Sequence, residues 1–382
     1  MDFSLNEEQL ALRDSIVRFA REQLNAGLIE RDHAGTFSRE LWRRCGAMGL
    51  LGLPVPESEG GSGADPLTCA IALEALGYAC RDGGLVFSIC AHVLACVTPV
   101  WKHGSETQRA RLLRGMCDGT LVGAHAITEP DSGSDTFSMR LRAERDGDGW
   151  RLNGAKTFIS NGPVADVVLV FAITDAVKRF HGGVTAFLVE RGTPGFNAGQ
   201  SFDKMGLRTS PVGELTFDDA RLSDHAVLGT VGGGAAVFAT AMDWERALLV
   251  AAHVGTIERL METTIAYARG RSQFGQTIGK FQAVAHKIAD MKVQLEAARL
   301  LVYRTATRLG SSRGIALDTS ITKLFVSETL LRTALDAVQL HGGYGFMKEY
   351  EVERALRDAI GATIYSGTSE MQRNIIARWL GL

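Results

Sequence analysis

Several common nucleotide-binding and metal-binding patterns are missing from this sequence. Neither GxGxxG nor GxxxxGK[ST] occurs in its 382 residues, so a bound nucleotide would be held by neither a Rossmann fingerprint nor a P-loop. The nine histidines are scattered, and no two lie within one helical turn of each other. The sequence therefore offers no local pair of histidine ligands, and we expect no metal site.

Cysteine pairs and an excess of one charge are also lacking. All six cysteines lie in the first third of the chain, and none forms a CxxC pair, which favours buried free thiols over a redox or metal role. The net charge is only −2, whereas proteins that bind nucleic acid usually carry a basic excess. We therefore expect no nucleic-acid partner.

The sequence also has no long apolar run free of polar residues. Its most apolar stretch, Gly83 to Val100, is interrupted by His92, and a membrane-spanning helix needs roughly 18 consecutive apolar residues. The first residues, MDFSLNEEQLALRDS, are acidic and polar, whereas a signal peptide begins basic and continues apolar. We expect a cytoplasmic protein with no membrane partner.

What the sequence does contain is a periodicity that changes twice. Up to about residue 120, apolar residues recur at helical spacing. Short β-type runs such as Val167–Ala172 follow, separated by Gly, Asp and Pro clusters. Helical periodicity then returns in long segments, roughly 235–269, 281–309, 315–342 and 368–380. This order predicts an α+β multidomain chain with boundaries at 1–120, 121–232 and 233–382.

Two polar, turn-rich motifs lie in the middle segment. Residues 126–135 read AITEPDSGSD, and residues 153–162 read NGAKTFISNG, a turn that leads into a strand. Phe158 and Ser160 share one face of that strand, because side chains alternate along a strand. A ring near a hydroxyl suits a flat cofactor, since the ring packs and the hydroxyl can bond a ring heteroatom. An ordinary strand and a surface loop would have the same patterns.

Three further motifs lie in the C-terminal segment, at residues 269–282 (RGRSQFGQTIGKFQ), 339–346 (QLHGGYGF) and 364–378 (IYSGTSEMQRNIIAR). Closely spaced glycines let a backbone approach a phosphate or a ring. The five motifs together resemble the acyl-CoA dehydrogenase family in order and spacing over the whole chain. The resemblance implies an N-terminal helical domain, a middle β-domain of barrel or sandwich type and a C-terminal four-helix bundle. It also implies a homotetramer, built as a dimer of dimers.

FAD is the cofactor that the resemblance implies. The isoalloxazine ring would contact Ile127, Thr128, Phe158 and Ser160, and the C-terminal loop would complete the site with Thr368 and Glu370. A neighbouring subunit would hold the pyrophosphate and adenine with Arg271, Phe274, Gln282, Gln339, Gly342 and Gly343. Ser134 would lie at the pantetheine arm of the substrate. Arg271 suits a phosphate because its planar guanidinium pairs two oxygens at once; a solvated charge at a helix end is the alternative.

The family's reaction needs a base, and the usual position of that base is changed here. The α-proton of an acyl thioester passes to a carboxylate while the β-hydrogen leaves as hydride to flavin N5. Most members carry the carboxylate as a Glu before the Gly-Thr of the last motif, where this sequence has Ser366. A serine without a neighbouring His or Lys is not a useful base. A minority, resembling isovaleryl-CoA and long-chain dehydrogenases, takes the base from an earlier helix, at the position of Glu245.

The residues around Glu245 support this assignment. Asp243, Glu245 and Arg246 interrupt a helix that is otherwise apolar from Ala235 to Ala252, and a buried carboxylate is costly unless it is paired or used. Burial would also raise its pKa towards the range of a general base. The alternative is an ion pair of Arg246 with Glu245 or Asp243. Asp243 and Arg246 are also candidate substrate contacts.

Ser366 can still contribute through its backbone. In the family, the N–H at this position and a flavin ribityl hydroxyl donate to the thioester carbonyl, and a main-chain donor survives a change of side chain. Ser366 could instead be the N-cap of the final helix, which Thr368 could equally supply, or could make room for substrate. We expect Tyr365 to pack against the acyl group or the flavin ring.

The helix at residues 84–99 corresponds to the one that lines the acyl pocket in the family. Ser88, Ala91 and Ala95 share one face at i, i+3 and i+7, and these small residues exclude no bulky acyl group; close helix packing would use the same residues. Segments 87–92, 244–245 and 366–368 most resemble the branch that acts on acyl or aminoacyl groups bound to a carrier protein, such as prolyl-carrier dehydrogenases. The glycine-rich loop 341–346 keeps the pattern of the wider family, which we expect to be altered in some prolyl enzymes.

The sequence therefore predicts an FAD-dependent dehydrogenase of acyl thioesters carried by CoA or a carrier protein, which share one phosphopantetheine arm. An electron-transfer flavoprotein or oxygen would accept the electrons. A prolyl-type carrier-protein dehydrogenase or oxidase is the second hypothesis. A non-catalytic flavin-binding or nucleic-acid-binding relative is the third, disfavoured by the intact Glu245 and the net charge.

Overall fold

The computed structural model describes residues 4–310 and 314–382. Its N-terminal part is helical, as the sequence predicts. Capping boxes pair Asn6 with Gln9 at the first helix and Ser105 with Gln108 at the last, which satisfies N–H groups that a helix start leaves free. The helices are α1 (Glu7–Gln23), α2 (Leu28–Ala34), α3 (Arg39–Ala47), α4 (Pro66–Ala79), α5 (Gly83–His92), α6 (Thr98–His103) and α7 (Glu106–Cys117).

The stretch Gly83–His103 is the buried centre of this part. It runs from α5 through a π-helical turn, η2 (Val93–Val97), into α6. By length and composition this stretch is apolar enough to cross a membrane, so the prediction that no stretch is long and apolar enough to do so is wrong. However, 94% of its most apolar 18-residue segment is buried inside the protein. Burial in the core therefore accounts for its composition.

The middle part is a sheet with strand order β6-β7-β3-β2-β4-β5-β8 and β1 beside β4. Most neighbours are antiparallel, but β4 pairs in parallel with β1 and β2. The sequence did not predict β1, β2 or β6, which are short and rich in charge or small residues. The strands are β1 (Gly123–Ala126), β2 (Arg142–Asp146), β3 (Gly149–Ser160), β4 (Val167–Ile173), β5 (Val184–Glu190), β6 (Phe196–Ser201), β7 (Val212–Ser223) and β8 (Val227–Leu228).

The C-terminal part is a bundle of long helices. The predicted helical segments agree with α9, α10, α11 and α13 to within one or two residues. Helix α12 was missed, although Val352, Ala355 and Ala359 recur along it at helical spacing. The hairpin β9 (Ser272–Gln273) and β10 (Gln276–Thr277) joins α9 to α10. The helices are α9 (Gly234–Gly270), α10 (Gln282–Arg308), α11 (Ile315–His341), α12 (Glu351–Ala362) and α13 (Ser369–Trp379).

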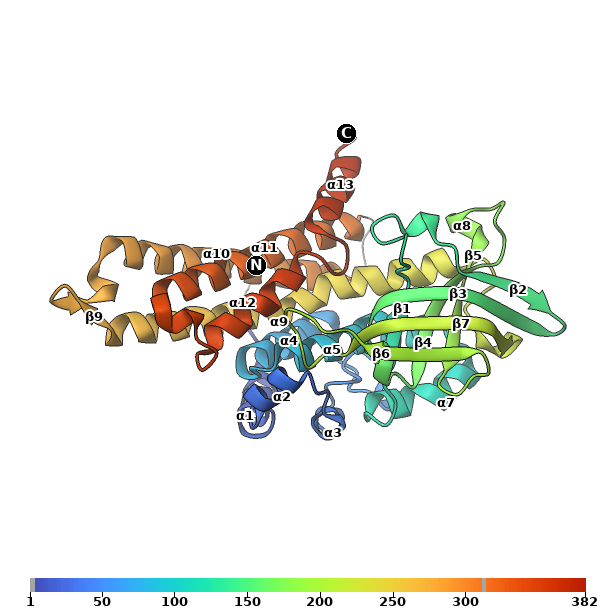
Figure 1. The fold of residues 1–382 in the computed structure, drawn as a ribbon, viewed down its shortest axis with the longest axis horizontal. Coiled ribbons are helices and arrows are strands. Elements are labelled where there is room, and N and C mark those ends of the chain that lie inside the picture. Colours follow the sequence, from blue (N-terminus) through green and yellow to red (C-terminus); the bar gives the residue numbers. More distant parts are fainter. Residues whose placement is uncertain (1–3, 311–313) are drawn as a thin grey trace.

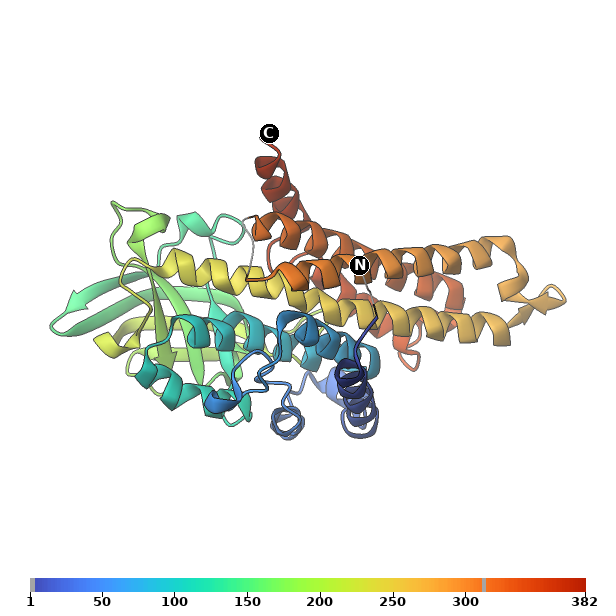
Figure 2. The same ribbon diagram turned by 180° about the vertical axis from the view of Figure 1, so that it is seen from behind.

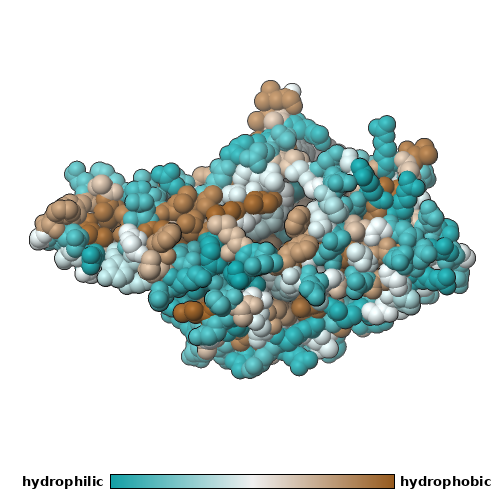
Figure 3. Space-filling view, in the orientation of Figure 1, coloured by the Kyte–Doolittle hydropathy of each residue, from teal (hydrophilic) through white to brown (hydrophobic). Residues whose placement is uncertain are grey.

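Helix α9 connects all three parts of the molecule. It runs from the sheet at one end to the β9–β10 hairpin at the other (Figures 1 and 2). Along its length it packs against α4, α5 and η2, against β5, and against α10 and α11. A side chain on α9 can therefore lie where the three parts meet. Figure 3 shows a hollow on one face there, between the bundle and the sheet and beside the start of α13.

Candidate active site

Glu245 lies on α9, on the length that packs against α5 and η2. Its side chain is buried, with 8% of the residue exposed. Burial raises the pKa of Glu245 to about 7, and the Ser366 hydroxyl and the charges of Arg246 and Lys323 oppose this shift. Loss of hydration disfavours the ionised form of a carboxylate. Glu245 is therefore a carboxyl group that can accept a proton near neutral pH.

The loop at residues 363–368, called the Ser366 loop, lies against Glu245 and is held by buried donors. Arg246 Nε donates to the Ser366 carbonyl at 2.9 Å, and Lys323 Nζ donates to the Gly367 carbonyl at 2.9 Å. Gln372 Nε2 donates to both carbonyls, at 3.2 and 2.8 Å. Lys323 and Gln372 are almost completely buried. These four hydrogen bonds fix the loop at two consecutive carbonyls.

The backbone of Ser366 is left-handed and its N–H is free. Ser366 has φ +57° and Gly367 has φ +90°, a conformation that is uncommon and strained for a serine. No described residue accepts a hydrogen bond from the Ser366 N–H. The serine hydroxyl is buried and makes no hydrogen bond of regular geometry with the described residues. The loop thus presents an unused main-chain donor next to the buried carboxyl group.

Two alternatives raised by the sequence do not hold. No ion pair joins Arg246 to Glu245 or Asp243 in the described part of the chain; Arg246 binds the Ser366 carbonyl instead. Ser366 is not the N-cap of α13, because Thr368 accepts a hydrogen bond from Met371 N and caps that helix. Asp243 is half-buried, and burial raises its pKa. Residues two apart on a helix point about 200° apart, so Asp243 and Glu245 face different sides of α9.

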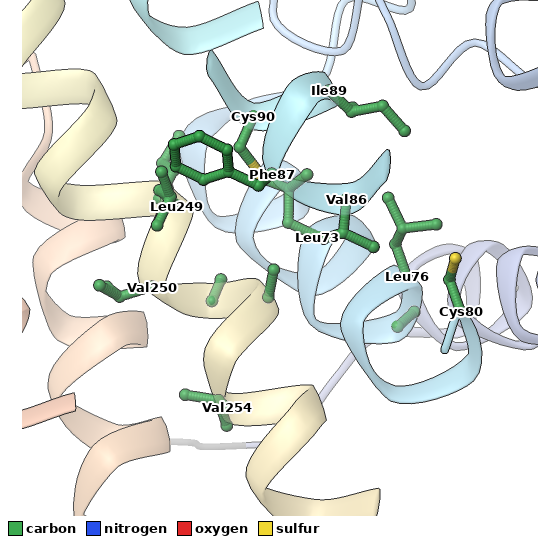
Figure 4. Close-up of a cluster of buried hydrophobic side chains, with 14 of the residues drawn as sticks. Leu73, Leu76, Cys80, Val86, Phe87, Ile89, Cys90, Leu249, Val250 and Val254 are labelled. Atoms are coloured by element: carbon green, nitrogen blue, oxygen red, sulfur yellow. The ribbon is translucent and has the colours of Figure 1, made fainter. Parts of the chain in front are cut away.

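Tyr365 extends from the Ser366 loop along α9. Its hydroxyl forms a 2.8 Å hydrogen bond with His253 Nε2, two helical turns beyond Glu245. The centre of its ring lies 4.5 Å from the centre of the Phe87 ring. A small cavity of about 50 Å³ continues past this pair, between α5, α9 and α12. In Figure 4 Phe87 and Cys90 project from α5 towards Leu249 of α9.

The three small residues expected to line the acyl pocket, Ser88, Ala91 and Ala95, do not line the cavity beyond Tyr365. Ser88 is buried and donates to the Ser210 hydroxyl at 2.8 Å. Ala95 lies in the π-helical turn η2 and packs with Ala241 and Met242 of α9. The wider π turn breaks the i, i+3, i+7 alignment that would place Ala95 on one face with Ser88 and Ala91. The side of α5 that faces the cavity carries Val86, Phe87 and Cys90 instead.

Strand β3 presents Phe158 on the surface. Phe158 has φ +56°, and the pairing of β3 with β7 shifts between Lys156 and Ile159. The regular alternation expected from the sequence is therefore interrupted by a bulge, which turns Phe158 outward. Phe158 is 67% exposed. Among the described residues the one aromatic ring against it is that of Phe202, with the ring centres 5.7 Å apart, edge to face. An exposed aromatic ring on a strained backbone is costly, and a flat ring stacked on Phe158 would bury its exposed apolar surface.

The loop after β1 is fastened to β3 beside Phe158. Thr157 N donates to the Thr128 carbonyl at 2.9 Å. Lys156 Nζ, fully buried, donates to the Ile127 carbonyl at 3.0 Å and pairs with Glu129 Oε1 at 2.7 Å. The structure thus brings Ile127, Thr128 and Phe158 together, as the sequence motifs require. Ser160 is half-buried at the end of β3, and Ser134 is exposed in the loop before β2.

A second group of expected cofactor contacts lies at the far end of the bundle. The Arg271 guanidinium lies 5.6 Å from the centre of the Tyr344 ring, which connects the hairpin to the turn after α11. Figures 1 and 2 both place this hairpin at the end of the molecule opposite the sheet. The group is exposed to solvent and consists of Arg271, Phe274, Gln282, Gln339, Gly342 and Gly343. Within one chain it cannot act on a ring at Phe158.

Thr368 and Glu370 lie nearer to the buried carboxyl group. Both line a groove between α11 and the start of α13, together with Ile364 of the Ser366 loop. Glu370 is exposed, and hydrogen bonds from its own backbone N–H and from Thr368 lower its pKa. The groove is therefore an open continuation of the Ser366 loop, with both apolar and polar side chains in its wall.

Comparison with known families agrees with this geometry along the whole chain. Residues 6–120 match the acyl-CoA dehydrogenase N-terminal domain, residues 124–220 the middle domain, and residues 232–381 the C-terminal domain. The chain belongs to the acyl-CoA dehydrogenase family. The predicted order of helical, β and helical domains is confirmed as the acyl-CoA dehydrogenase fold.

Similar acyl-CoA dehydrogenase family members act on carrier-bound substrates. An L-prolyl-[peptidyl-carrier protein] dehydrogenase of Pseudomonas fluorescens is 41% identical over 385 residues, covering 100% of both chains. The crystal structure of the prolyl acyl carrier protein oxidase AnaB has a TM-score of 0.97 and 42% identity, covering 99% of this chain and 100% of that one. A structure described as PigA with FAD and proline has a TM-score of 0.97 and 40% identity, with full coverage of both chains.

Sequence reasoning missed the residues that hold the loops and the aromatic ring of this acyl-CoA dehydrogenase site in place. Lys323 interrupts an apolar length of α11, as Glu245 does on α9, so the same pattern could have found it. Lys156 and Glu129 form a buried ion pair between residues 27 positions apart, and no local sequence pattern predicts such a pair. Phe87 and His253 read as ordinary residues of core helices. Only the fold shows that they meet Tyr365.

Proposed function

We propose that this enzyme dehydrogenates an acyl thioester between Cα and Cβ, with Glu245 as the base. The observation that carries the proposal is a buried carboxyl group with a pKa of about 7 beside a fixed loop with a free N–H. When bound, FAD supplies the acceptor for the β-hydride, which no side chain can provide. In this chain Ile127, Thr128, Phe158, Ser160, Thr368 and Glu370 would hold it.

Glu245 and the Ser366 N–H have complementary roles in this proposal. The α-proton of a thioester is weakly acidic, and a hydrogen bond from a main-chain donor to the thioester carbonyl stabilises the charge that develops as the proton leaves. Glu245 takes the proton, and its burial keeps water away and its basicity high. Arg246, Lys323 and Gln372 hold the loop by its two carbonyl groups, and in this way they position the N–H.

The proposed substrate is a small acyl or aminoacyl group on the phosphopantetheine arm of a carrier protein. The support is the 41% identity over the full length to an enzyme named for a prolyl group on a peptidyl carrier. Ser134 would contact the arm. Asp243 and Arg246 are also candidate substrate contacts. Asp243 faces another side of α9 than Glu245, and Arg246 holds the Ser366 loop. The same group on CoA is the second candidate.

Assembly and electron transfer belong to the same proposal. The exposed group around Arg271 would hold the FAD pyrophosphate and adenine of a neighbouring subunit, in a homotetramer built as a dimer of dimers. Phe274 and Phe346 near this group are 93% and 78% exposed, and subunit contact would bury them. An electron-transfer flavoprotein or oxygen would take the electrons. The six free cysteines are all buried, and unpaired thiols fit a reducing cytoplasm.

Single-turnover reduction of the bound flavin tests the substrate. The enzyme is mixed without oxygen with prolyl and butanoyl groups, each on a holo-carrier protein and on CoA, and the loss of flavin absorbance is followed. We expect the carrier-bound prolyl group to react fastest. Equal or faster reduction by butanoyl-CoA would reject the carrier and leave a short-chain acyl-CoA dehydrogenase. Absence of reduction by all four thioesters would reject the proposed function.

A further inference from the structure

We infer that Phe87 and Tyr365 form a closed aromatic end of the acyl site, which restricts the enzyme to small acyl groups. The inference rests on the proposed function and deepens it by naming the residues that set the substrate class. It begins from the position of Tyr365, whose backbone adjoins Ser366 and whose hydroxyl reaches His253 at 2.8 Å. Glu245 and His253 are both on α9, about 12 Å apart along its axis.

The Tyr365 ring therefore crosses the face of α9 that extends from Glu245. Glu245 and Leu249 are one turn apart and lie on the same side of the helix. Leu249 lines the cavity behind the aromatic pair, whereas Glu245 does not. An acyl chain that starts at Glu245 and extends along α9 meets the Tyr365 and Phe87 rings before it reaches the cavity. Two rings whose centres are 4.5 Å apart are in contact, and they leave no passage for a methylene chain between them.

The two rings are held firmly in place. Tyr365 is anchored at one end by the backbone of the Ser366 loop and at the other by its hydrogen bond to His253. Burial lowers the pKa of His253 to about 3, so the imidazole is neutral near neutral pH. Phe87 is 9% exposed and belongs to the buried cluster of α4, α5 and α9. Neither ring can move aside without breaking packing or a hydrogen bond.

The cavity behind the rings has both apolar and charged side chains in its wall, and Arg354 and Asp358 of α12 are among the charged ones. Next to the rings it is lined by Val86, Leu249 and Ala252. Towards its far end Arg259 pairs with Glu351, and Arg81 lies 3.4 Å from the same carboxylate. From Leu249 to Arg259 the cavity follows about 15 Å of helix. A longer chain admitted past the rings would fit the apolar part and would stop at the ion pairs.

The decisive variant is Phe87→Ala, which removes one ring and joins the acyl site to the cavity. Single-turnover flavin reduction is compared for butanoyl, hexanoyl, octanoyl and hexadecanoyl thioesters on the same carrier. We expect wild-type enzyme to prefer butanoyl. The variant should raise the octanoyl-to-butanoyl ratio at least tenfold, because each newly buried methylene is worth roughly fourfold in affinity. Hexadecanoyl should stay inactive, since its end would displace the Arg259–Glu351 pair.

Ile89→Ala is the matched control on the same helix. Ile89 is completely buried but does not line the cavity, and Figure 4 shows it on the side of α5 away from Leu249. This variant loses core packing to a similar extent and should leave the chain-length profile unchanged. Phe87→Val serves as a milder form of the first variant if Phe87→Ala does not fold. An unchanged profile in the folded Phe87 variant, or the same change in Ile89→Ala, would overturn the inference.

A binding measurement separates this inference from the proposed function. S-butyl and S-octyl thioethers of phosphopantetheine cannot react, and their affinity is measured by calorimetry. Tighter binding of the octyl compound to the Phe87 variant than to wild type supports the closed aromatic end whether or not any thioester is oxidised. Equal octyl affinity in both proteins rejects it, even if wild-type enzyme reduces its flavin with short thioesters.

Discussion

Arg246 donates from Nε to the Ser366 carbonyl at 2.9 Å, although the two residues are 120 positions apart in the chain. The residue that follows the proposed base therefore holds the loop that carries the proposed carbonyl donor. This relationship explains why a charged side chain next to Glu245 is not its ion-pair partner. It also couples the placement of the base to the placement of the donor.

Arg246→Lys should slow flavin reduction by substrate about 100-fold while FAD stays bound. A lysine keeps the positive charge but lacks the Nε–H that fixes the Ser366 carbonyl, and small displacements in an active site cost about this much in rate. Ser366→Ala is the control, because it keeps the main-chain N–H and should change the rate only a few-fold. A normal rate in Arg246→Lys, or a rate loss of 100-fold in Ser366→Ala, would contradict the proposed role of the loop.

The rate of flavin reduction should rise with pH through about 7, because only ionised Glu245 accepts a proton. Stability should respond in the opposite direction. A carboxyl group whose pKa is raised on folding binds more protons in the folded state, so folding stability falls as pH rises from about 5 to 7. For a pKa of about 7 against an ordinary value of 4.5, the loss is about 3 kcal/mol.

Chemical unfolding of wild type and Glu245→Gln at several pH values checks the stability part. Lys323, Asp243 and Arg246 also face this region and change little between the two proteins, so the difference between them isolates Glu245. The difference should widen in favour of the glutamine variant as pH rises from 5 to 8. A difference that is constant with pH would mean that Glu245 keeps an ordinary pKa.

Lys156→Met should weaken FAD binding and destabilise the middle domain. The substitution leaves Glu129 as an unpaired buried charge, which costs about 3–5 kcal/mol, and releases the Ile127 carbonyl next to Phe158. Lys156→Met combined with Glu129→Gln removes the unpaired charge and keeps a side-chain oxygen for the Leu141 N–H. This double variant should recover much of the stability but not the wild-type flavin absorbance spectrum, since the Ile127 carbonyl still lacks its lysine partner. A wild-type spectrum and FAD affinity in the double variant would show that the pair has only a structural role.

Arg271→Ala should weaken FAD binding about 10- to 100-fold, as expected for the loss of charged hydrogen bonds to a phosphate. The exposed Arg269, two residues earlier, provides a control of the same charge. Arg269→Ala should retain FAD. Fluorescence titration of apoprotein with FAD measures both affinities. Equal loss in the two variants would point to a general effect of charge rather than to a specific contact.

The long helices could be predicted from the sequence, because they are periodic, and the domain order could be predicted from the family motifs. The contacts between segments that are distant in the sequence could not be predicted. The ends of α9, α10, α11 and α13 were predicted closely, since helical periodicity is a local signal. Helix α12 was missed although its apolar residues recur at helical spacing, so this miss does not reflect a missing local signal. The bulge at Phe158 and the π turn at Ala95 depend on pairing and packing that no local pattern records.

The same division applies to the site. Glu245 could be predicted because an acidic residue in an apolar helix is anomalous, and because Ser366 occupies the usual position of the base. The roles of Arg246 and Thr368 could not be decided, since ion pair, loop anchor and helix cap all fit the same sequence. The side of α5 that borders the cavity beyond Tyr365 could not be predicted, because side-chain size alone does not show which face of a fully buried helix borders a cavity.

Glu245→Gln tests the central claim most directly. The amide has nearly the shape of the carboxyl group but cannot accept the α-proton, so folding and FAD content should be unchanged. The measurement is the rate of flavin absorbance loss in a single turnover with the best thioester substrate, at a pH well above 7. We expect the rate to fall by about 10²–10⁴-fold, as for loss of a general base. A rate within a few-fold of wild type would contradict it, and the base would then be another residue.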